Sequence, residues 1–353
     1  MSMMGSPFIC SGSSTAGGGG GGGFAVAEPR TSDYVANETN KGKIWMRTDE
    51  TSETVKMVVE FTGSASWTAG TAIGTARSGI SGSGASADSA LAFGGSTGGS
   101  ESTISEEWEG VSWSTSDGQL PTAFQIAGAA GTLSATISAG GFDGTTRDDM
   151  VTYDGATWTE SLAVMVSSRR GAPLLGTTSS ALCCAGYSGS VYLATTETYN
   201  GATWSDEGQN VAVAHDTAYA GGTGTTSAGL SAGGRSNLGA NITNTDEWDG
   251  ATWSAGGGIS ARSDGDVRGS QSNAVYIAGI TGSGQTDTFL YDGAAWSSSV
   301  SINTARYSHC GSGASPSGTM KIFGGFVSGL ATTSVEDYAP PASTYSVKTF
   351  SFA

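Results

Sequence analysis

Short apolar runs recur along this chain, and each one ends in small residues. Every run is too short for a helix and stops at glycine, so the pattern predicts strands. Four runs end in Gly-Gly and two in Ala-Gly. The six runs are Leu91–Gly95, Thr136–Gly141, Leu182–Gly186, Leu230–Gly234, Val275–Gly279 and Lys321–Gly325. No stretch shows the spacing of an amphipathic helix, so the chain is predicted to be all-β.

A second motif follows the first five runs in a constant register. The motif begins with an aromatic residue, usually continues with Asp-Gly or Asn-Gly, and closes with Trp. Its copies lie at residues 108–113, 153–158, 199–204, 248–253 and 291–296, with a looser copy at 61–67. The closing residues are separated by 46, 45, 46, 49 and 43 positions and are Trp67, Trp113, Trp158, Trp204, Trp253 and Trp296. A period of about 40 to 50 residues that carries strands predicts a β-propeller, here with six blades.

A third landmark precedes each apolar run. It is a basic or aromatic residue followed by glycine, at Arg77, Phe124, Arg170, His215, Arg262 and Arg306. The order of basic residue, diglycine run, aromatic-Asp-Gly turn and Trp resembles the kelch repeat over residues 58 to 338, although two of the six copies replace the usual Arg. The resemblance implies a six-bladed kelch-like β-propeller with an extended N-terminal anchoring segment.

Each landmark has an expected structural role. Diglycine is predicted to end an inner strand where neighbouring blades crowd together and no side chain fits. The aromatic-Asp-Gly segment is predicted to be a tight turn between two outer strands. Each of the six Trp side chains is predicted to fill the space between adjacent blades.

Two ring closures are open at this point. The chain begins with a Trp closure and ends with a diglycine run, so Val58 to Phe61 and Trp67 could complete the blade that contains Gly324 and Gly325. Alternatively, residues 335–338 and 346–352 close that blade, and the first strands pair elsewhere or belong to a seventh blade.

Composition excludes several classes of function. The 353 residues include 57 glycines and are 37% apolar, which fits thin strands in a repeat better than one thick core. The formal charge of −16 leaves no electrostatic footprint for nucleic acid. No apolar run approaches the roughly 20 residues of a membrane span, so no membrane insertion is expected.

The reactive residue types form no recognisable catalytic or metal-binding set. The four cysteines show no zinc-site spacing and are interpreted as small fillers. Only two histidines are present, and no second tyrosine matches the ligand set of a copper oxidase on a propeller. Four of the arginines share one repeat phase, as a sialidase triad would, but that phase is also the structural Arg position of kelch repeats. We expect no metal, no cofactor and no enzymatic activity.

The N-terminal region suggests an anchor. Residues 1–40 lack the features of a signal peptide and contain a heptaglycine, Gly17 to Gly23. Residues 42–59 resemble the strand–turn–strand segment of bacteriophage tail and fibre proteins, and propellers with such Asp-Gly turns resemble proteins of marine cyanobacterial phages. The expected organisation is an anchor at 1–40, a hairpin connector at 41–57, the propeller at 58–338 and a tail or closing strand at 339–353.

The leading hypothesis is therefore a non-enzymatic phage virion structural protein, as a tail fibre, adhesin or particle decoration in multiple copies. It would be assembled in the host cytoplasm and exposed on the particle. Its N-terminal segment would contact other virion proteins, and its propeller would bind a host surface glycan or protein. The alternatives are a cellular kelch-type scaffold for a protein partner and a carbohydrate-active propeller enzyme.

The loops after the diglycine runs are the expected binding surface, because they diverge while the Asp-Gly turns stay constant. They cover residues 96–105, 142–149, 187–196 and 235–245. Arg147, Arg235 and Asn237 are candidates for hydrogen bonds to sugar hydroxyls or acidic glycans, and Tyr187 and Tyr192 for stacking on a sugar. The alternative is that these loops are only solvated.

Overall fold

Strands are the only regular element longer than one turn in the described part of the chain. The computed structural model describes residues 28–30, 35–37, 39, 41, 44–47, 54–116, 118–217, 222–237, 239–313 and 316–351. The chain divides into two compact units, one formed by Met1–Gly63 with Ser343–Ala353 and the other by Ser64–Ala342. No helix capable of crossing a membrane occurs among the described residues.

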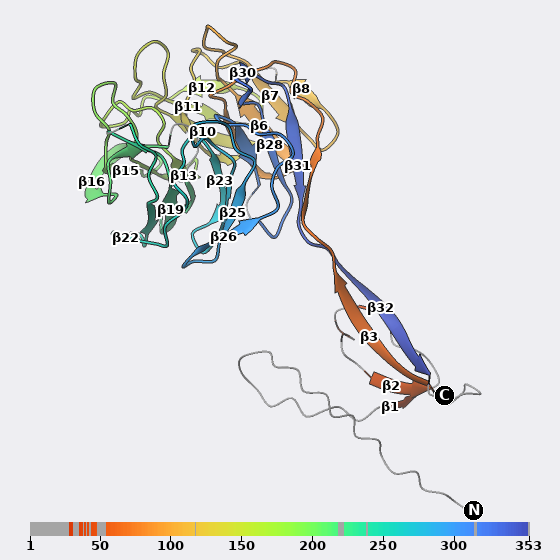
Figure 1. Ribbon diagram of the computed structural model, residues 1–353. Helices are drawn as coiled ribbons and strands as arrows, with labels where there is room; N and C mark the ends of the chain where they lie inside the picture. The colour runs from red at the N-terminus through yellow and green to blue at the C-terminus, as the bar shows by residue number, and fades with distance from the viewer. Residues whose placement is uncertain are drawn as a thin grey trace, which may run out of the picture. The chain divides into compact units, whose positions relative to one another are not determined.

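The first unit contains one sheet built from both ends of the described chain. Its strands are β1 (Glu28–Arg30), β2 (Ile44–Arg47), β3 (Thr54–Thr62) and β32 (Ser343–Ser351). β3 and β32 run antiparallel side by side over their whole length, from Thr54 opposite Ser351 to Thr62 opposite Ser343 (Figure 1). β2 pairs antiparallel with β3, which is the strand–turn–strand arrangement expected for residues 42–59. The turn predicted between these two strands, at residues 48–53, and the heptaglycine lie outside the described residues.

The second unit is a propeller of six four-stranded blades (Figure 1). Blades 1 to 3 are β5 (Ser81–Ser86), β6 (Ser89–Phe93), β7 (Ser105–Trp108) and β8 (Trp113–Thr115); β9 (Gly128–Thr132), β10 (Ala135–Ala139), β11 (Met150–Tyr153) and β12 (Trp158–Glu160); and β13 (Leu174–Thr177), β14 (Ser180–Cys184), β15 (Thr195–Tyr199) and β16 (Trp204–Asn210).

Blades 4 and 5 repeat this plan, and blade 6 differs in the origin of its fourth strand. Blade 4 consists of β18 (Gly222–Thr225), β19 (Ala228–Ala232), β21 (Thr245–Trp248) and β22 (Trp253–Ala255). Blade 5 consists of β23 (Asp266–Ser270), β24 (Asn273–Ile277), β25 (Thr288–Tyr291) and β26 (Trp296–Ser299). Blade 6 consists of β27 (Cys310–Ser312), β28 (Met320–Phe323), β31 (Val335–Ala339) and β4 (Ser66–Ala69). The predicted all-β fold with six blades is confirmed.

The first strand of each blade lies at the centre of the ring. Neighbouring first strands contact one another in sequence, and β27 contacts β5 to close the circle. The second strands are buried on both faces, as β6 shows: Leu91 packs with residues of blade 2, and its neighbour Ala92 packs with residues of blade 6. Burial on both faces explains why these strands read as unbroken apolar runs rather than alternating ones.

The diglycine ends the second strand of each four-stranded blade, which is an inner strand as predicted. The crowding is as predicted: a Cβ on Gly95 would lie 2.9 Å from the Ser78 carbonyl oxygen. The first position of the pair adopts a left-handed conformation in the Ala-Gly copies too, with φ of 57° at Ala185 and 55° at Ala278. These two blades therefore accept a strained alanine where Gly94 stands in blade 1.

The closing Trp side chains lie between blades, as predicted. Trp158 of blade 2 packs on Phe93 of blade 1, with ring centroids 4.6 Å apart, and its Nε1 donates to Ser105 Oγ at 3.1 Å. Trp253 and Trp296 likewise donate to a threonine of the preceding blade. Three of the six Trp residues are buried and three are half-buried, so none offers an exposed platform for a sugar.

The ring is closed by the N-terminal strand β4. Trp67 pairs with Tyr338, with ring centroids 5.1 Å apart, and Asn303 donates to the Trp67 carbonyl at 2.9 Å. The expectation that Val58 to Phe61 would join this blade is wrong, because they lie in β3 and pair with β32. The nine-residue register with β32 satisfies more backbone groups than the edge of a blade could. The propeller unit accordingly starts at Ser64 rather than at residue 58.

The interblade Trp contacts predict a large stability effect. Trp158→Ala should lower the free energy of unfolding by about 3–5 kcal/mol, the usual cost of removing a buried large aromatic side chain. Denaturant unfolding of the purified chain measures this effect. Val111→Ala, in an exposed turn of blade 1, is the control and should change stability by less than about 0.5 kcal/mol. A loss below about 1 kcal/mol for Trp158→Ala would contradict the packing role.

A matched pair of glycines tests the interblade crowding. Gly279 and Gly282 both have positive φ, 95° and 109°, but a Cβ on Gly279 would lie 2.5 Å from the Ser263 carbonyl oxygen, whereas Gly282 has open space. Gly279→Ala should therefore cost about 1–3 kcal/mol more than Gly282→Ala in denaturant unfolding. Equal costs would show that only the backbone conformation matters.

Candidate functional site

Backbone hydrogen bonds close one end of the propeller into a rigid rim. Six residues, one from each blade, each donate an N–H to the carbonyl of the corresponding residue in the preceding blade, at 2.7 to 3.3 Å. The last link runs from Gly79 to Ser308 and closes the circle. We call this set the rim; it consists of Gly79, Ile126, Gly171, Thr217, Asp264 and Ser308. Ile126, Asp264 and Ser308 take left-handed φ values near those of Gly79 and Gly171.

A second set of interblade bonds lies outside the rim. The glycine that ends each apolar run donates its N–H to the landmark residue of the next blade, for example Gly95 to Phe124 at 2.8 Å and Gly325 to Arg77 at 2.8 Å. Once Arg169 is taken as the landmark of blade 3 in place of Arg170, each landmark stands two residues before its rim residue. The sequence landmarks thus mark the points where adjacent blades are joined.

The residue after each landmark faces the residue after each diglycine run. These two residues form a short antiparallel bridge in every blade, such as Arg170 with Tyr187, or β17 (His215–Asp216) with β20 (Arg235–Ser236). We call the twelve residues the mouth ring, because they surround the rim: Ser78, Ser96, Gln125, Phe142, Arg170, Tyr187, Asp216, Arg235, Ser263, Ile280, Tyr307 and Phe326. Their backbone is fixed by the repeat, whereas their side chains differ from blade to blade.

Aromatic and charged side chains gather on the mouth ring in blades 2 to 4. The Arg170 guanidinium lies over Phe142 at 4.8 Å and over Tyr187 at 5.1 Å. Tyr187 packs on Tyr192, with ring centroids 5.0 Å apart. All four side chains are only half-buried, so this surface is open to a ligand.

Two carboxylates and a second arginine complete this sector. Arg235 forms an ion pair with Asp264 of the rim, at 3.5 Å. Burial raises the pKa of Asp216 to about 7, Arg235 and Arg170 oppose the shift, and the Asp264 carboxylate adds to it. Burial and the Asp216 charge also raise the pKa of Tyr192. We call Arg170, Tyr187, Tyr192, Asp216 and Arg235 the polar sector.

The mouth ring has a different character at blades 5 and 6. Tyr307 and Phe326 stack there with ring centroids 5.2 Å apart, beside β29 (Phe326–Val327) and β30 (Leu330–Ala331). An open groove of about 330 Å³ lies between them and the blade 5 loop that contains Ile280. Blade 1 contributes only two serines, so the ring is chemically asymmetric.

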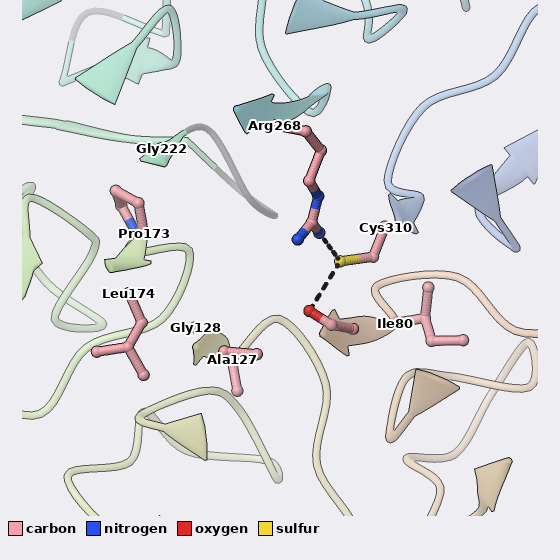
Figure 2. A pocket seen from close by; sticks show the side chains of 10 residues that line it. Ile80, Ala127, Gly128, Pro173, Leu174, Gly222, Arg268 and Cys310 are labelled. Atoms are coloured by element: carbon pink, nitrogen blue, oxygen red, sulfur yellow. Dashed lines mark hydrogen bonds between the residues drawn. The ribbon is translucent and has the colours of Figure 1, made fainter. Parts of the chain in front are cut away.

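The channel beneath the rim is nearly filled. The space bordered by all six blades measures about 20 Å³, room for roughly one water. Figure 2 shows Arg268 reaching toward Cys310, whose Sγ lies 2.9 Å from the guanidinium, with Pro173 and Leu174 on the other side. Arg268 Nε also donates to Asp266 at 2.8 Å. Among the described residues, this cavity is therefore too small to hold a sugar.

The predicted ligand residues have different fates. Tyr187, Tyr192 and Arg235 come together in the polar sector, and Asn237 is exposed in the following turn. Arg147 is wrong as a ligand residue, because it is 6% exposed and its guanidinium lies 5.2 Å above the Phe124 ring, with Asp149 at 3.1 Å. Sequence reasoning missed Asp216 as a site residue and interpreted Arg170 as structural.

The landmark of blade 3 is Arg169, so the prediction that it is the neighbouring Arg170 is wrong. Arg169 is fully buried and bonds to Glu197, as Arg77 does to Glu106 in blade 1. Arg306 pairs with Glu336 at 2.9 Å in blade 6. These guanidiniums are consumed by bonds within their own blades, so they do not form an arginine triad at the axis.

Histidine and cysteine also act as structural residues. His215 is buried, with Nδ1 2.6 Å from the Val213 carbonyl, and burial lowers its pKa. Burial raises the pKa of Cys310 and Cys183 to about 12, which keeps both thiols unreactive at neutral pH. Among the described residues no group of three or more His, Cys, Asp or Glu side chains could hold a metal ion.

The sheets define a six-bladed β-propeller whose mouth ring carries different side chains from blade to blade. No protein-family model matches the chain, and no curated protein matches it. Among solved structures the chain is similar to that of YjhT, with a TM-score of 0.61 over 79% of this chain and 98% of that one, at 13% identity. At this identity the similarity shows the fold alone.

The six blades suggest a test of the buried ion pairs. Blade 2 holds Phe124 and Val151 where blade 3 holds Arg169 and Glu197. Glu197→Val alone should cost about 3–5 kcal/mol, because it leaves a buried guanidinium without its partner. The double variant Arg169→Phe/Glu197→Val should recover about half of that loss in denaturant unfolding. Recovery is partial because Glu197 also accepts the amides of Val166 and Ser167. A double variant less stable than Glu197→Val would contradict this interpretation.

Proposed function

We propose that the protein is a non-catalytic glycan-binding propeller whose polar sector contacts the sugar. The observation that carries the proposal is the half-buried Tyr187–Tyr192 pair beside Arg170, Asp216 and Arg235 on the mouth ring. Aromatic faces supply apolar contact at low entropic cost, and the charged groups supply hydrogen-bond donors and acceptors. Both are what a sugar with one apolar face and many hydroxyls needs.

The rigidity of the scaffold supports this role. Each mouth residue sits in a two-residue bridge next to the rim, so its backbone is positioned before a ligand arrives. Preorganisation lowers the entropic cost of binding. The divergence of these positions among six otherwise similar blades fits a recognition surface rather than a structural one.

The wider setting we propose is a phage virion, with the propeller presented to a host surface. Its support is the resemblance of residues 42–59 to tail and fibre proteins and the organisation into two units, one of which contains both ends of the described chain. The N-terminal segment would contact other virion proteins, and several copies would be carried per particle. Mass spectrometry of purified virions tests this part. If the protein is found only in the lysate of infected cells and never on particles, the proposed virion setting is rejected.

An enzyme is the second candidate, and Asp216 is the observation that favours it. A carboxyl group with a pKa of about 7 beside the Asp264 carboxylate is suited to proton transfer near neutral pH. Propellers carry both binding and catalytic functions, so fold alone does not decide. Release of sugar from any glycan that the protein binds, lost in Asp216→Asn, would establish this alternative.

The polar sector predicts the outcome of aromatic truncation. Tyr187→Ala and Tyr192→Ala should each weaken binding to a glycan identified on an array by about tenfold or more, because a stacking face is lost. Both variants should keep the unfolding midpoint of the parent chain within a few degrees. Val111→Ala, in a turn that joins the ends of β7 and β8 distal to the mouth, should bind normally. Unchanged binding by both tyrosine variants would place any receptor site elsewhere.

A further inference from the structure

Among the described arginines of the propeller, Arg170 is distinguished by having no ion pair. Seven of them form an ion pair, at Arg77, Arg147, Arg169, Arg235, Arg262, Arg268 and Arg306. Within the described residues, the Arg170 guanidinium has neither an ion pair nor a hydrogen bond. Because the side chain is only half-buried, its N–H groups are left to water or to a ligand.

The two aromatic rings hold this guanidinium in place. Phe142 and Tyr187 both contact it, with centroids 4.8 and 5.1 Å from Cζ. Ring contacts use the face of the guanidinium plane and leave the N–H groups, which lie in that plane, available. The N–H fork matches the geometry of a carboxylate or a sulfate and can bind either in a bidentate manner.

Arg262 in blade 5 shows that stacking alone does not free a guanidinium. It also lies over two rings, Phe289 at 4.2 Å and Tyr276 at 5.7 Å. Its donors, however, reach the Ala278 carbonyl at 3.3 Å and Asp287 at 3.5 Å, and its side chain is 3% exposed. Arg262 is a structural arginine, whereas Arg170 has the same support and no internal acceptor.

We propose that Arg170 is the anchor for an oxyanion group on the ligand, so that the protein selects acidic saccharides over neutral ones. This inference rests on the proposed glycan-binding function and names its ligand class. Tyr187 and Tyr192 then stack on the ring that carries the acidic group. The formal charge of −16 makes general attraction of polyanions unfavourable, so selection must come from this local site.

Asp216 gives the proposal a pH signature. The charged or titratable groups around its carboxyl group are its bridge partner Arg235, Asp264 of blade 5, and Arg170 and Tyr192 of blade 3. Below a pH of about 7 the carboxyl group is neutral and does not repel an anionic ligand. Above that pH it carries a negative charge near the proposed anion position. Affinity for an acidic saccharide should therefore fall as the pH rises from 6 to 8, whereas affinity for a neutral one should not.

The experiment is a glycan array with carboxylated, sulfated and neutral members, followed by calorimetry on a bound glycan and its neutral counterpart. The parent chain should retain mainly acidic glycans. The carboxylated and sulfated members show which oxyanion is preferred. Arg170→Gln should weaken acidic binding about tenfold or more, as expected for loss of a bidentate charged pair, and should weaken neutral binding much less. Arg170→Lys should restore only part of the affinity, because it keeps the charge and loses the fork.

Two controls separate this site from general charge and from the proposed function. Lys348→Gln removes one positive charge from the first unit and should leave acidic binding unchanged. Asp216→Asn should flatten the pH dependence without abolishing binding. If the parent chain binds only neutral glycans, or if Arg170→Gln binds acidic glycans as well as the parent does, the proposed selection of acidic saccharides is overturned while glycan binding stands. If the parent chain binds no glycan at all, both the proposed selection and the proposed function are overturned.

Discussion

The closed circle of backbone hydrogen bonds at the rim is the constraint on which the rest of the propeller depends. A blade by itself exposes unpaired edges and apolar faces, and only a neighbour on each side covers them. The rim bonds fix the distance and rotation between neighbours, and the diglycine bonds repeat this one layer further out. Both require backbone conformations or close approaches that most side chains resist. Ile126, Asp264 and Ser308 nevertheless take left-handed conformations, which indicates how strongly the circle is enforced.

Fixing the rim also fixes where chemistry can vary. The mouth residues follow directly after the landmark and after the diglycine, so they are presented identically in all six blades whatever their type. Inside the blades the residue types vary less, but they do vary. The landmark and its partner on the third strand are Arg169 with Glu197 in blade 3, Phe124 with Val151 in blade 2, and Arg262 with the Phe289 ring in blade 5. Blade 4 holds His215 with Asp246, whose buried carboxyl group accepts the Ala212 N–H at 3.2 Å and whose pKa is raised by burial. A charged group at this site is therefore either matched by a counter-ion or shifted toward its neutral form, as expected where unpaired burial is costly.

Much of this could be predicted from the sequence, because period, turns and Trp positions all follow from the repeat. The number of blades and the interblade Trp needed no other information. The prediction that Arg170 is the landmark of blade 3 is wrong by one position. Neighbouring residues of an extended chain point in opposite directions, so a shift of one position exchanges a buried side chain for an exposed one. The spacing of two residues from landmark to rim glycine, as in Arg77 to Gly79, would have selected Arg169. The prediction that Arg147 binds a ligand is wrong for another reason: its burial depends on contact with Phe124, which is distant in sequence, and no periodicity reveals that contact. The prediction that residues 58–61 belong to the last blade is wrong because they pair with the longer strand β32 instead.

The asymmetry of the mouth decides how a ligand must lie. Blade 1 presents two serines, blades 2 to 4 present the aromatic and charged groups, and blade 6 presents an apolar groove. The axis itself is closed beneath the rim by Arg268 and Cys310, with space for about one water. An acidic glycan bound as proposed would lie across one side of the mouth, with its charged part over blades 3 and 4. That geometry is typical of surface recognition rather than of an enclosed substrate pocket.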